Sequence, residues 1–159
     1  NGLFVSVGDD GILTSSDGTN WTQQTNTGTS EVLIGITYGN GLFVSVGYPS
    51  IILTSSNGTS WTQQSTSLTS YYLDRVIYGN GLFVSVGEEG IILTSSDGTS
   101  WTKRTPGISE SLYGVTYSNG KFVTVGGNGT ILTTSDGTSW MTQRTYRNSY
   151  FLNGVTYSQ

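Results

Sequence analysis

The hydrophobic residues of this chain alternate with small polar residues along many short stretches. In the stretch 42–46, for example, a leucine and two valines would share one face of a strand, with a phenylalanine and a serine on the other. Such stretches are rich in valine, isoleucine, threonine and aromatic residues, and glycine and asparagine separate them. The period of two and the absence of alanine predict an all-β protein, and they exclude an array of helix pairs.

The stretches recur with a period close to 40 residues. The segment "NGLFVSVG" begins at residues 1, 40 and 80 and returns as "NGKFVTVG" at 119, while "LIGITYG" at 33–39 has counterparts beginning at 73, 112 and 152. The four tryptophans keep the same spacing, at Trp21, Trp61, Trp101 and Trp140. Several short strands within a 40-residue repeat are typical of a β-propeller blade. The sequence therefore predicts a four-bladed β-propeller.

Each repeat is expected to contain four strands, which in the second repeat span 33–38, 42–46, 51–55 and 61–65. Asn40-Gly41 would form the first hairpin turn, because both residues tolerate a positive φ. We expect one domain over 1–159, with blades at 2–25 plus 152–158, 33–65, 73–105 and 112–145.

The chain begins on the second strand of a repeat and ends on the first strand of another. We therefore expect 152–157 to pair with 3–7 and to close the ring within one chain, which would remove two unpaired sheet edges. A homodimer with eight blades is the alternative, and the monomer is favoured. A start inside a repeat also suggests a processed or excised product.

A second repeated segment reads "SSDGTNWTQQT" at 15–25 and returns in each of the other repeats. It resembles the Asp-box of the bacterial-neuraminidase-repeat, or sialidase-like, β-propellers, whose pattern is Ser/Thr-x-Asp-x-Gly-x-x-Trp. Here glycine follows the aspartate directly, and tryptophan comes four residues after the aspartate, so the turn is one residue tighter. The matching residues are Asp17 with Trp21, Asn57 with Trp61, Asp97 with Trp101 and Asp136 with Trp140.

These residues are expected to have a structural role. The Asp or Asn side chain would accept backbone N–H groups across the turn, and the indole would be buried between neighbouring sheets. Calcium is the rival interpretation. Asn57 removes the charge in one repeat, and one carboxylate per turn suits a cation with six to eight oxygen ligands poorly. We therefore expect neither a metal nor a cofactor.

Composition excludes several partners. The net charge is −4 and the six cationic residues form no basic run, so nucleic acid is not expected to bind. The longest apolar stretches are about five residues, far below the ~20 that a membrane-spanning helix needs, so no membrane insertion is expected. The surface rich in serine, threonine and asparagine suggests an extracellular or cell-surface protein.

An enzyme is not expected. The resemblance to sialidases would imply six blades, three arginines around a substrate carboxylate, a Tyr–Glu nucleophile pair and an aspartate. Here Arg75 stands on a first strand, Arg104 and Arg144 stand at equivalent positions of fourth strands, and Arg147 stands in the following loop, so three of them are not expected to converge on one centre. The absence of histidine and cysteine removes the common triads and metal sites.

The repeats differ mainly in two sets of loops, which should emerge on the same side of the propeller. One set joins the second and third strands, and the other joins successive repeats. Arg75, preceded by Asp74, stands where three repeats have glycine. These two residues could contribute to a site at the central channel, but the favoured interpretation is a pair that simply fills the channel. The acidic pairs 9–10 and 88–89 are interpreted as solvated loop charges. The candidate ligand-binding residues are Tyr48, Tyr71, Tyr72, Asp74, Arg75, Tyr113, Tyr146, Arg147 and Tyr150.

Tyrosines among serine, threonine and asparagine are typical of adaptable recognition surfaces. We therefore expect a non-enzymatic binding module for a glycan or a protein surface. The alternative is a structural scaffold, recently amplified or engineered, that binds no small ligand and could form half of an eight-bladed dimer.

Overall fold

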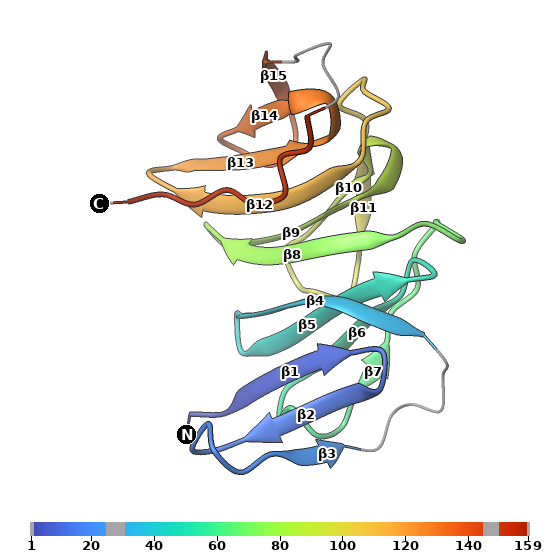
Figure 1. The fold of residues 1–159 in the computed structure, drawn as a ribbon, viewed down its shortest axis with the longest axis vertical. Helices are drawn as coiled ribbons and strands as arrows, with labels where there is room; N and C mark the ends of the chain where they lie inside the picture. The colour runs from blue at the N-terminus through green and yellow to red at the C-terminus, as the bar shows by residue number, and fades with distance from the viewer. Residues whose placement is uncertain (1, 25–30, 145–149, 159) are drawn as a thin grey trace.

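The computed structural model of the chain describes residues 2–24, 31–144 and 150–158, which contain four antiparallel sheets (Figure 1). The first sheet has three strands, β1 (Phe4–Gly8), β2 (Gly11–Ser15) and β3 (Thr22–Gln24). The other three sheets have four strands each: β4 (Val32–Gly39), β5 (Leu42–Tyr48), β6 (Ile52–Ser55) and β7 (Thr62–Gln63); β8 (Leu73–Gly79), β9 (Leu82–Gly87), β10 (Ile92–Ser95) and β11 (Thr102–Arg104); β12 (Leu112–Ser118), β13 (Lys121–Gly126), β14 (Ile131–Thr134) and β15 (Met141–Arg144). The all-β prediction is confirmed.

Single turns of 3-10 helix, η1 (Glu88–Gly90) and η2 (Gly127–Gly129), follow β9 and β13. Among the described residues no helix is long and apolar enough to cross a membrane.

The strands of each sheet follow one another in chain order, so every sheet is a meander. β4 contacts β8, and β8 contacts β12, which places the first strands of successive blades side by side. The register of each of these strands against the second strand shifts once, at Leu33/Gly35, Leu73/Arg75 and Leu112/Gly114. The irregularity therefore belongs to the repeat, and it recurs near the loop end of each first strand.

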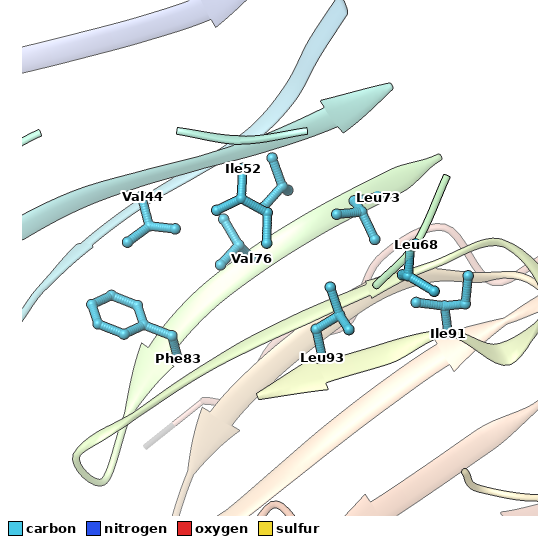
Figure 2. Packing of buried hydrophobic residues seen from close by; sticks show 9 residues of the cluster. Val44, Ile52, Leu68, Leu73, Val76, Phe83, Ile91 and Leu93 are labelled. Carbon is cyan, nitrogen blue, oxygen red and sulfur yellow. The ribbon is translucent and has the colours of Figure 1, made fainter. Parts of the chain in front are cut away.

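The hydrophobic core lies between the sheets. Val44 and Ile52 project from one blade toward Phe83 and Leu93 of the next, and all four side chains are buried (Figure 2). Since a strand presents alternate residues to its two faces, both faces of an interior blade are apolar and each is covered by a neighbouring blade. Stability therefore comes from the contacts between blades.

Glycines at the ends of the first strands set the spacing of the blades. Gly39 lies directly against the ring of Tyr78, and Gly79 lies against the ring of Tyr117 in the same way. A Cβ atom at either glycine would occupy the space of the neighbouring ring. The tyrosine of one blade can pack this closely only because the preceding blade has no side chain at that point.

The first hairpin turn of each four-stranded sheet is Asn-Gly, as predicted for Asn40-Gly41. Asn40 has φ 48° and Gly41 has φ 77°, and the turns of the next two blades repeat these values closely. Two successive positive φ angles are typical of a tight hairpin turn whose twist matches that of the strands.

The repeated Asp/Asn segment forms the turn between the third and fourth strands. In the third blade Asp97 Oδ1 accepts the backbone N–H groups of Thr99 and Ser100, each at 2.8 Å. Ser95 Oγ donates to the same oxygen at 2.9 Å and accepts the N–H of Gly98 at 2.8 Å. The side chains therefore satisfy turn amides that no ladder partner reaches.

Asn57 makes the same contacts without a charge. Its Oδ1 accepts the N–H groups of Thr59 and Ser60, each at 2.9 Å. In the charged turns these hydrogen bonds, led by the Ser100 amide, hold the pKa of Asp97 well below its usual range. Oδ1 of Asp97 is thus occupied by the turn's own donors.

Each turn tryptophan donates its indole N–H to the carbonyl of the turn glycine, as Trp101 does to Gly98 at 2.9 Å. Trp61, Trp101 and Trp140 are half-buried and pack against the clusters between blades. The predicted burial is wrong for Trp21, which is 43% exposed. Its side chain lies on the first blade, which has a neighbour on one side only.

The predicted pairing of 152–157 with 3–7 is absent from the structure. β1 pairs with β2, and residues 150–158 belong to no strand (Figure 1). Gly154 instead lies against β12, since a Cβ built on Gly114 would be 3.1 Å from the Gly154 Cα. Arg75 has the same relation to Gly35, also at 3.1 Å. The spacing that separates successive first strands therefore carries the C-terminal segment beyond β12, away from β1.

Trp61→Ala is expected to lower the free energy of unfolding by about 2–3 kcal/mol. Truncation of a completely buried indole would cost ~3–5 kcal/mol, and this indole is only half-buried. The exposed residue Gln63, on the strand that follows Trp61 directly, provides the control, since Gln63→Ala should change stability by less than about 0.5 kcal/mol. Urea denaturation at a fixed protein concentration measures both. Equal effects of the two substitutions would contradict a packing role for the indole.

Asp97→Ala is expected to lower the urea midpoint, whereas Asp97→Asn should leave it close to that of the wild type. The amide oxygen can accept the same two backbone N–H groups, as Asn57 does in the second blade. A large loss of stability in the Asn variant would show that the charge matters more than the acceptor.

Candidate functional site

Two sets of loops meet on one side of the blades, which we call the loop face. Ser50, after β5, donates its N–H to the Tyr71 carbonyl at 2.7 Å, and Glu88, after β9, donates to the Tyr72 carbonyl at 3.0 Å. Gly127, after β13, donates to the Ser111 carbonyl at 2.8 Å. The loops after β5, β9 and β13 are thus hydrogen-bonded to the segments that enter first strands, and they form an ordered rim. The Asn-Gly and Asp/Asn turns lie on the opposite side, the turn face.

Tyr48 and Tyr72 stack on each other at this rim. Their ring centroids are 4.3 Å apart and the ring planes are inclined by 21°. Tyr48 ends β5 in the second blade, and Tyr72 precedes β8 in the third, so the stack bridges two blades. Tyr72 remains 39% exposed, and its ring is therefore available to a ligand.

Asp74 follows Tyr72 closely in the sequence. It lies on β8, at the point where the register with β9 shifts. Its side chain is half-buried, and one of its carboxylate oxygens is buried without a hydrogen-bond partner among the described residues. Burial, with a smaller contribution from the negative charge of Glu88, raises the pKa of Asp74 to about 6. The positive charge of Arg75 opposes this shift.

Arg75 does not neutralise Asp74 by a direct ion pair. Its Nη1 donates to the backbone carbonyl of Asp74 at 2.8 Å, and its side chain is exposed. The described residues therefore show no contact between the Asp74 carboxylate and the Arg75 guanidinium, although the interpretation as a channel-filling pair would involve one. The equivalents of Asp74 in the other repeats are Ile34, Tyr113 and Asn153.

Glu88 belongs to the site, although sequence analysis treated it as a solvated charge. Its Oε2 accepts the backbone N–H of Tyr72 at 3.0 Å. The pairing of the first and second strands could have indicated this contact. Leu73 faces Gly87 across β8 and β9, so the neighbouring residues Tyr72 and Glu88 lie close together. Glu88 both holds the Tyr72 backbone and adds negative charge near Asp74.

The remaining candidates do not join this cluster. Tyr71 is half-buried and packs against the core between the second and third blades. Tyr113 lies near Phe151, with ring centroids 6.1 Å apart, and Tyr150 is exposed. Tyr146 and Arg147 lie outside the described residues. The cluster that the structure assembles, which we call the Tyr72 cluster, consists of Tyr48, Tyr72, Asp74, Arg75 and Glu88.

Most of the carboxylates lie on the loop face, together with Arg75 and Arg104. Three of the ten carboxylates of the chain belong to turn-face aspartates, and the other seven stand in the loops or at the loop ends of strands. These seven are Asp9, Asp10, Glu31, Asp74, Glu88, Glu89 and Glu110. The described residues contain no group of three or more acidic, histidine or cysteine side chains placed to hold a metal ion.

Solved structures with a similar arrangement of sheets show that the fold is a β-propeller. They include YCF48 bound to D1 peptide (22% identity, TM-score 0.70, covering 96% of this chain and 53% of that one). YCF48 from Cyanidioschyzon merolae has 18% identity and a TM-score of 0.60, with 88% and 55% covered. A nidogen/laminin complex has 16% identity and a TM-score of 0.70, with 98% and 65% covered. The chain therefore spans between about half and two thirds of the structures it matches.

No protein-family model matches the sequence, and no curated protein matches it significantly. The Asp-box likeness of the turns accordingly remains a resemblance, while the β-propeller fold is established by the structure and its neighbours.

Asp74→Asn is expected to stabilise the protein at pH 8, and the gain should shrink below about pH 4. Because the folded pKa is about 6 and the unfolded value is 3.8, the folded protein holds this proton more tightly. Wild-type stability therefore falls as the pH rises through this window, and the amide removes that loss. Urea denaturation between pH 4 and 8 tests the expectation. Parallel pH profiles of the two proteins would contradict the raised pKa.

Proposed function

We propose that the chain is a non-enzymatic binding module that recognises a basic segment of a peptide or protein on its loop face. The observation that carries the proposal is the Tyr72 cluster, in which an exposed tyrosine stack lies near carboxylates that no described cation neutralises by an ion pair. Aromatic faces and partly desolvated carboxylates both attract lysine and arginine side chains.

The charge distribution supports a basic partner. In the Tyr72 cluster the carboxylates of Asp74 and Glu88 outnumber the single guanidinium of Arg75, and an excess of negative charge attracts a positively charged segment and orients it before contact. The hydrogen-bonded rim supports binding in another way, since loops that are already ordered lose little conformational entropy when a partner binds.

Similar propellers give independent support for a protein ligand. One of the YCF48 structures contains D1 peptide, and the nidogen structure is a complex with laminin. Neither the charge of the loop face nor these structures favours a neutral glycan, the other ligand class that the tyrosine loops suggest.

The test is binding to an array of twelve-residue peptides whose charge varies systematically, followed by titration with the best binder. Basic peptides should bind and acidic ones should not. Tyr72→Ser should weaken the binding of the selected basic peptide at least about tenfold, which corresponds to ~1.4 kcal/mol. Raising the salt concentration should also weaken it. Lowering the pH from 7.5 to 5 should have the same effect, because the pKa of Asp74 is about 6.

Tyr38→Ser is the control, because Tyr38 is even more exposed than Tyr72 but lies on the turn face, near the end of β4. It should leave the affinity unchanged. Binding that ignores peptide charge, or that falls equally in both tyrosine variants, would contradict recognition through the Tyr72 cluster.

A further inference from the structure

The chain contains several Asn-Gly dipeptides, and the fold places them in two different environments. Three form the tips of the first hairpins of the four-stranded blades, and these tip pairs are Asn40-Gly41, Asn80-Gly81 and Asn119-Gly120. Two lie in packed turns, and these packed pairs are Asn57-Gly58, in the Asp/Asn turn of the second blade, and Asn128-Gly129, in η2. Asn153-Gly154 stands at a first-strand position and belongs to neither group.

An asparagine that precedes glycine can react with its own backbone. The glycine nitrogen attacks the side-chain Cγ, the Cγ–Nδ2 bond breaks, and the nitrogen's proton leaves with the ammonia that is released. One water then opens either C–N bond of the resulting five-membered succinimide and yields aspartate or isoaspartate. The net reaction exchanges an amide for a carboxylate and needs only water. Glycine favours this reaction because it has no side chain to hinder the approach of its nitrogen.

The tip pairs leave the attacking nitrogen free. In the second blade the ladder of the first hairpin ends where Gly39 faces Leu42, and the two residues between them are exposed. Neither the Gly41 N–H nor the Asn40 side chain forms a hydrogen bond with another described residue. A Cβ atom placed on Gly41 would meet no atom within 4 Å, so the tip has open space in which to rearrange.

The other two tips repeat this arrangement. Asn80 and Asn119 have φ 50° and 48°, close to the 48° of Asn40, and both are exposed together with the glycines that follow them. Gly81 and Gly120 likewise have open space around the Cβ position. The nitrogen reaches Cγ only when the turn opens locally. Such opening costs little free energy at a hairpin tip that lies outside the packed sheets.

The packed pairs hold both reacting groups in place. Asn57 Oδ1 accepts two backbone N–H groups of its own turn, each at 2.9 Å, which fixes the side-chain carbonyl. The Gly58 N–H donates to Ser55 Oγ at 2.8 Å, and Gly58 is buried. Gly129 is buried as well, and its N–H donates to the Tyr150 carbonyl at 2.9 Å. In each packed pair the nitrogen must lose a hydrogen bond before it can attack.

We propose that Asn40, Asn80 and Asn119 are sites of spontaneous deamidation in the folded protein, and that Asn57 is protected by the hydrogen bonds of its turn. The three sites lie on the turn face, on the opposite side from the Tyr72 cluster. The modification is therefore separate from the binding function proposed for the loop face.

The two products affect the fold differently. Aspartate keeps the tip, because Asp-Gly also suits a two-residue hairpin turn, and it adds one negative charge. Isoaspartate places the Cβ atom in the backbone, so the loop becomes one atom longer and no longer matches the pairing of Gly39 with Leu42. Conversion of all three tips adds three negative charges to the net charge of −4. An aged protein thus gains negative charge on its turn face and loses hairpin register at the isoaspartate tips.

The first test is incubation of the folded protein at mildly alkaline pH, followed by peptide mapping with mass spectrometry. Asn40, Asn80 and Asn119 should each be converted at least about tenfold faster than Asn57, which corresponds to ~1.4 kcal/mol of local opening. The control is the same incubation in guanidinium chloride, where the four rates should become similar because the fold is lost. Conversion of Asn57 as fast as the tips in the folded protein would overturn the proposal. Tips that stay intact while the denatured chain is converted would overturn it as well.

The second test removes the hydrogen bond that protects the packed pair. Ser55→Ala deletes the acceptor of the Gly58 N–H and should speed the conversion of Asn57 at least about threefold, in line with the loss of one hydrogen bond. Ser56→Ala is the matched control, because Ser56 is the exposed neighbour in the same turn and should leave the rate unchanged. The tip rates serve as the internal reference in both variants, and circular dichroism verifies that both are folded. An unchanged rate at Asn57 in the folded Ser55 variant would contradict protection by the turn.

Discussion

The packing of one blade against the next is the interaction on which the rest of this structure depends. Every sheet has two apolar faces, and a blade keeps them from water only when it has a neighbour on each side. Val44 and Ile52 are completely buried because Phe83 and Leu93 lie opposite them. Leu13, in an equivalent position to Leu93, is exposed because no sheet lies opposite it. Burial of each apolar face thus requires a neighbouring blade, through the same hydrophobic effect that forms the interior.

Much of the fold could be predicted from the sequence, because the determinants are local and repeated. Alternation specified the strands, Asn-Gly specified the first turn, and the Asp/Asn segment specified the second. The path of the C-terminal segment could not be predicted, since strand pairing rules do not indicate which partner edge a strand reaches. That outcome depends on the step between blades, which the contact of Gly39 with Tyr78 helps to set. A repeat pattern in the sequence does not specify the angle between successive blades.

The candidate site was predicted in part for a similar reason. Differences between repeats pointed to Tyr48, Tyr72 and Asp74, because each of these residues differs from its equivalents in the other repeats. The same comparison missed Glu88. Its role depends on one hydrogen bond to the Tyr72 backbone, and acidic residues are ordinary in exposed loops. Residue type could not distinguish a solvated carboxylate from one that holds a neighbouring strand.

The energetics of Asp74 fit the proposed binding of a cation better than they fit an ion pair that fills the channel. Burial raises the pKa of this carboxyl to about 6, so its charged form destabilises the folded protein near neutral pH. A channel-filling ion pair would have the opposite effect, because a guanidinium bound to the carboxylate would lower the pKa. Arg75 instead donates to the backbone carbonyl at 2.8 Å and leaves the carboxylate to other partners. A cation that bound there would offset the cost of desolvation that the free protein bears. In the proposed complex, the residue that weakens the free fold would also contribute to binding, a combination typical of binding sites on rigid scaffolds.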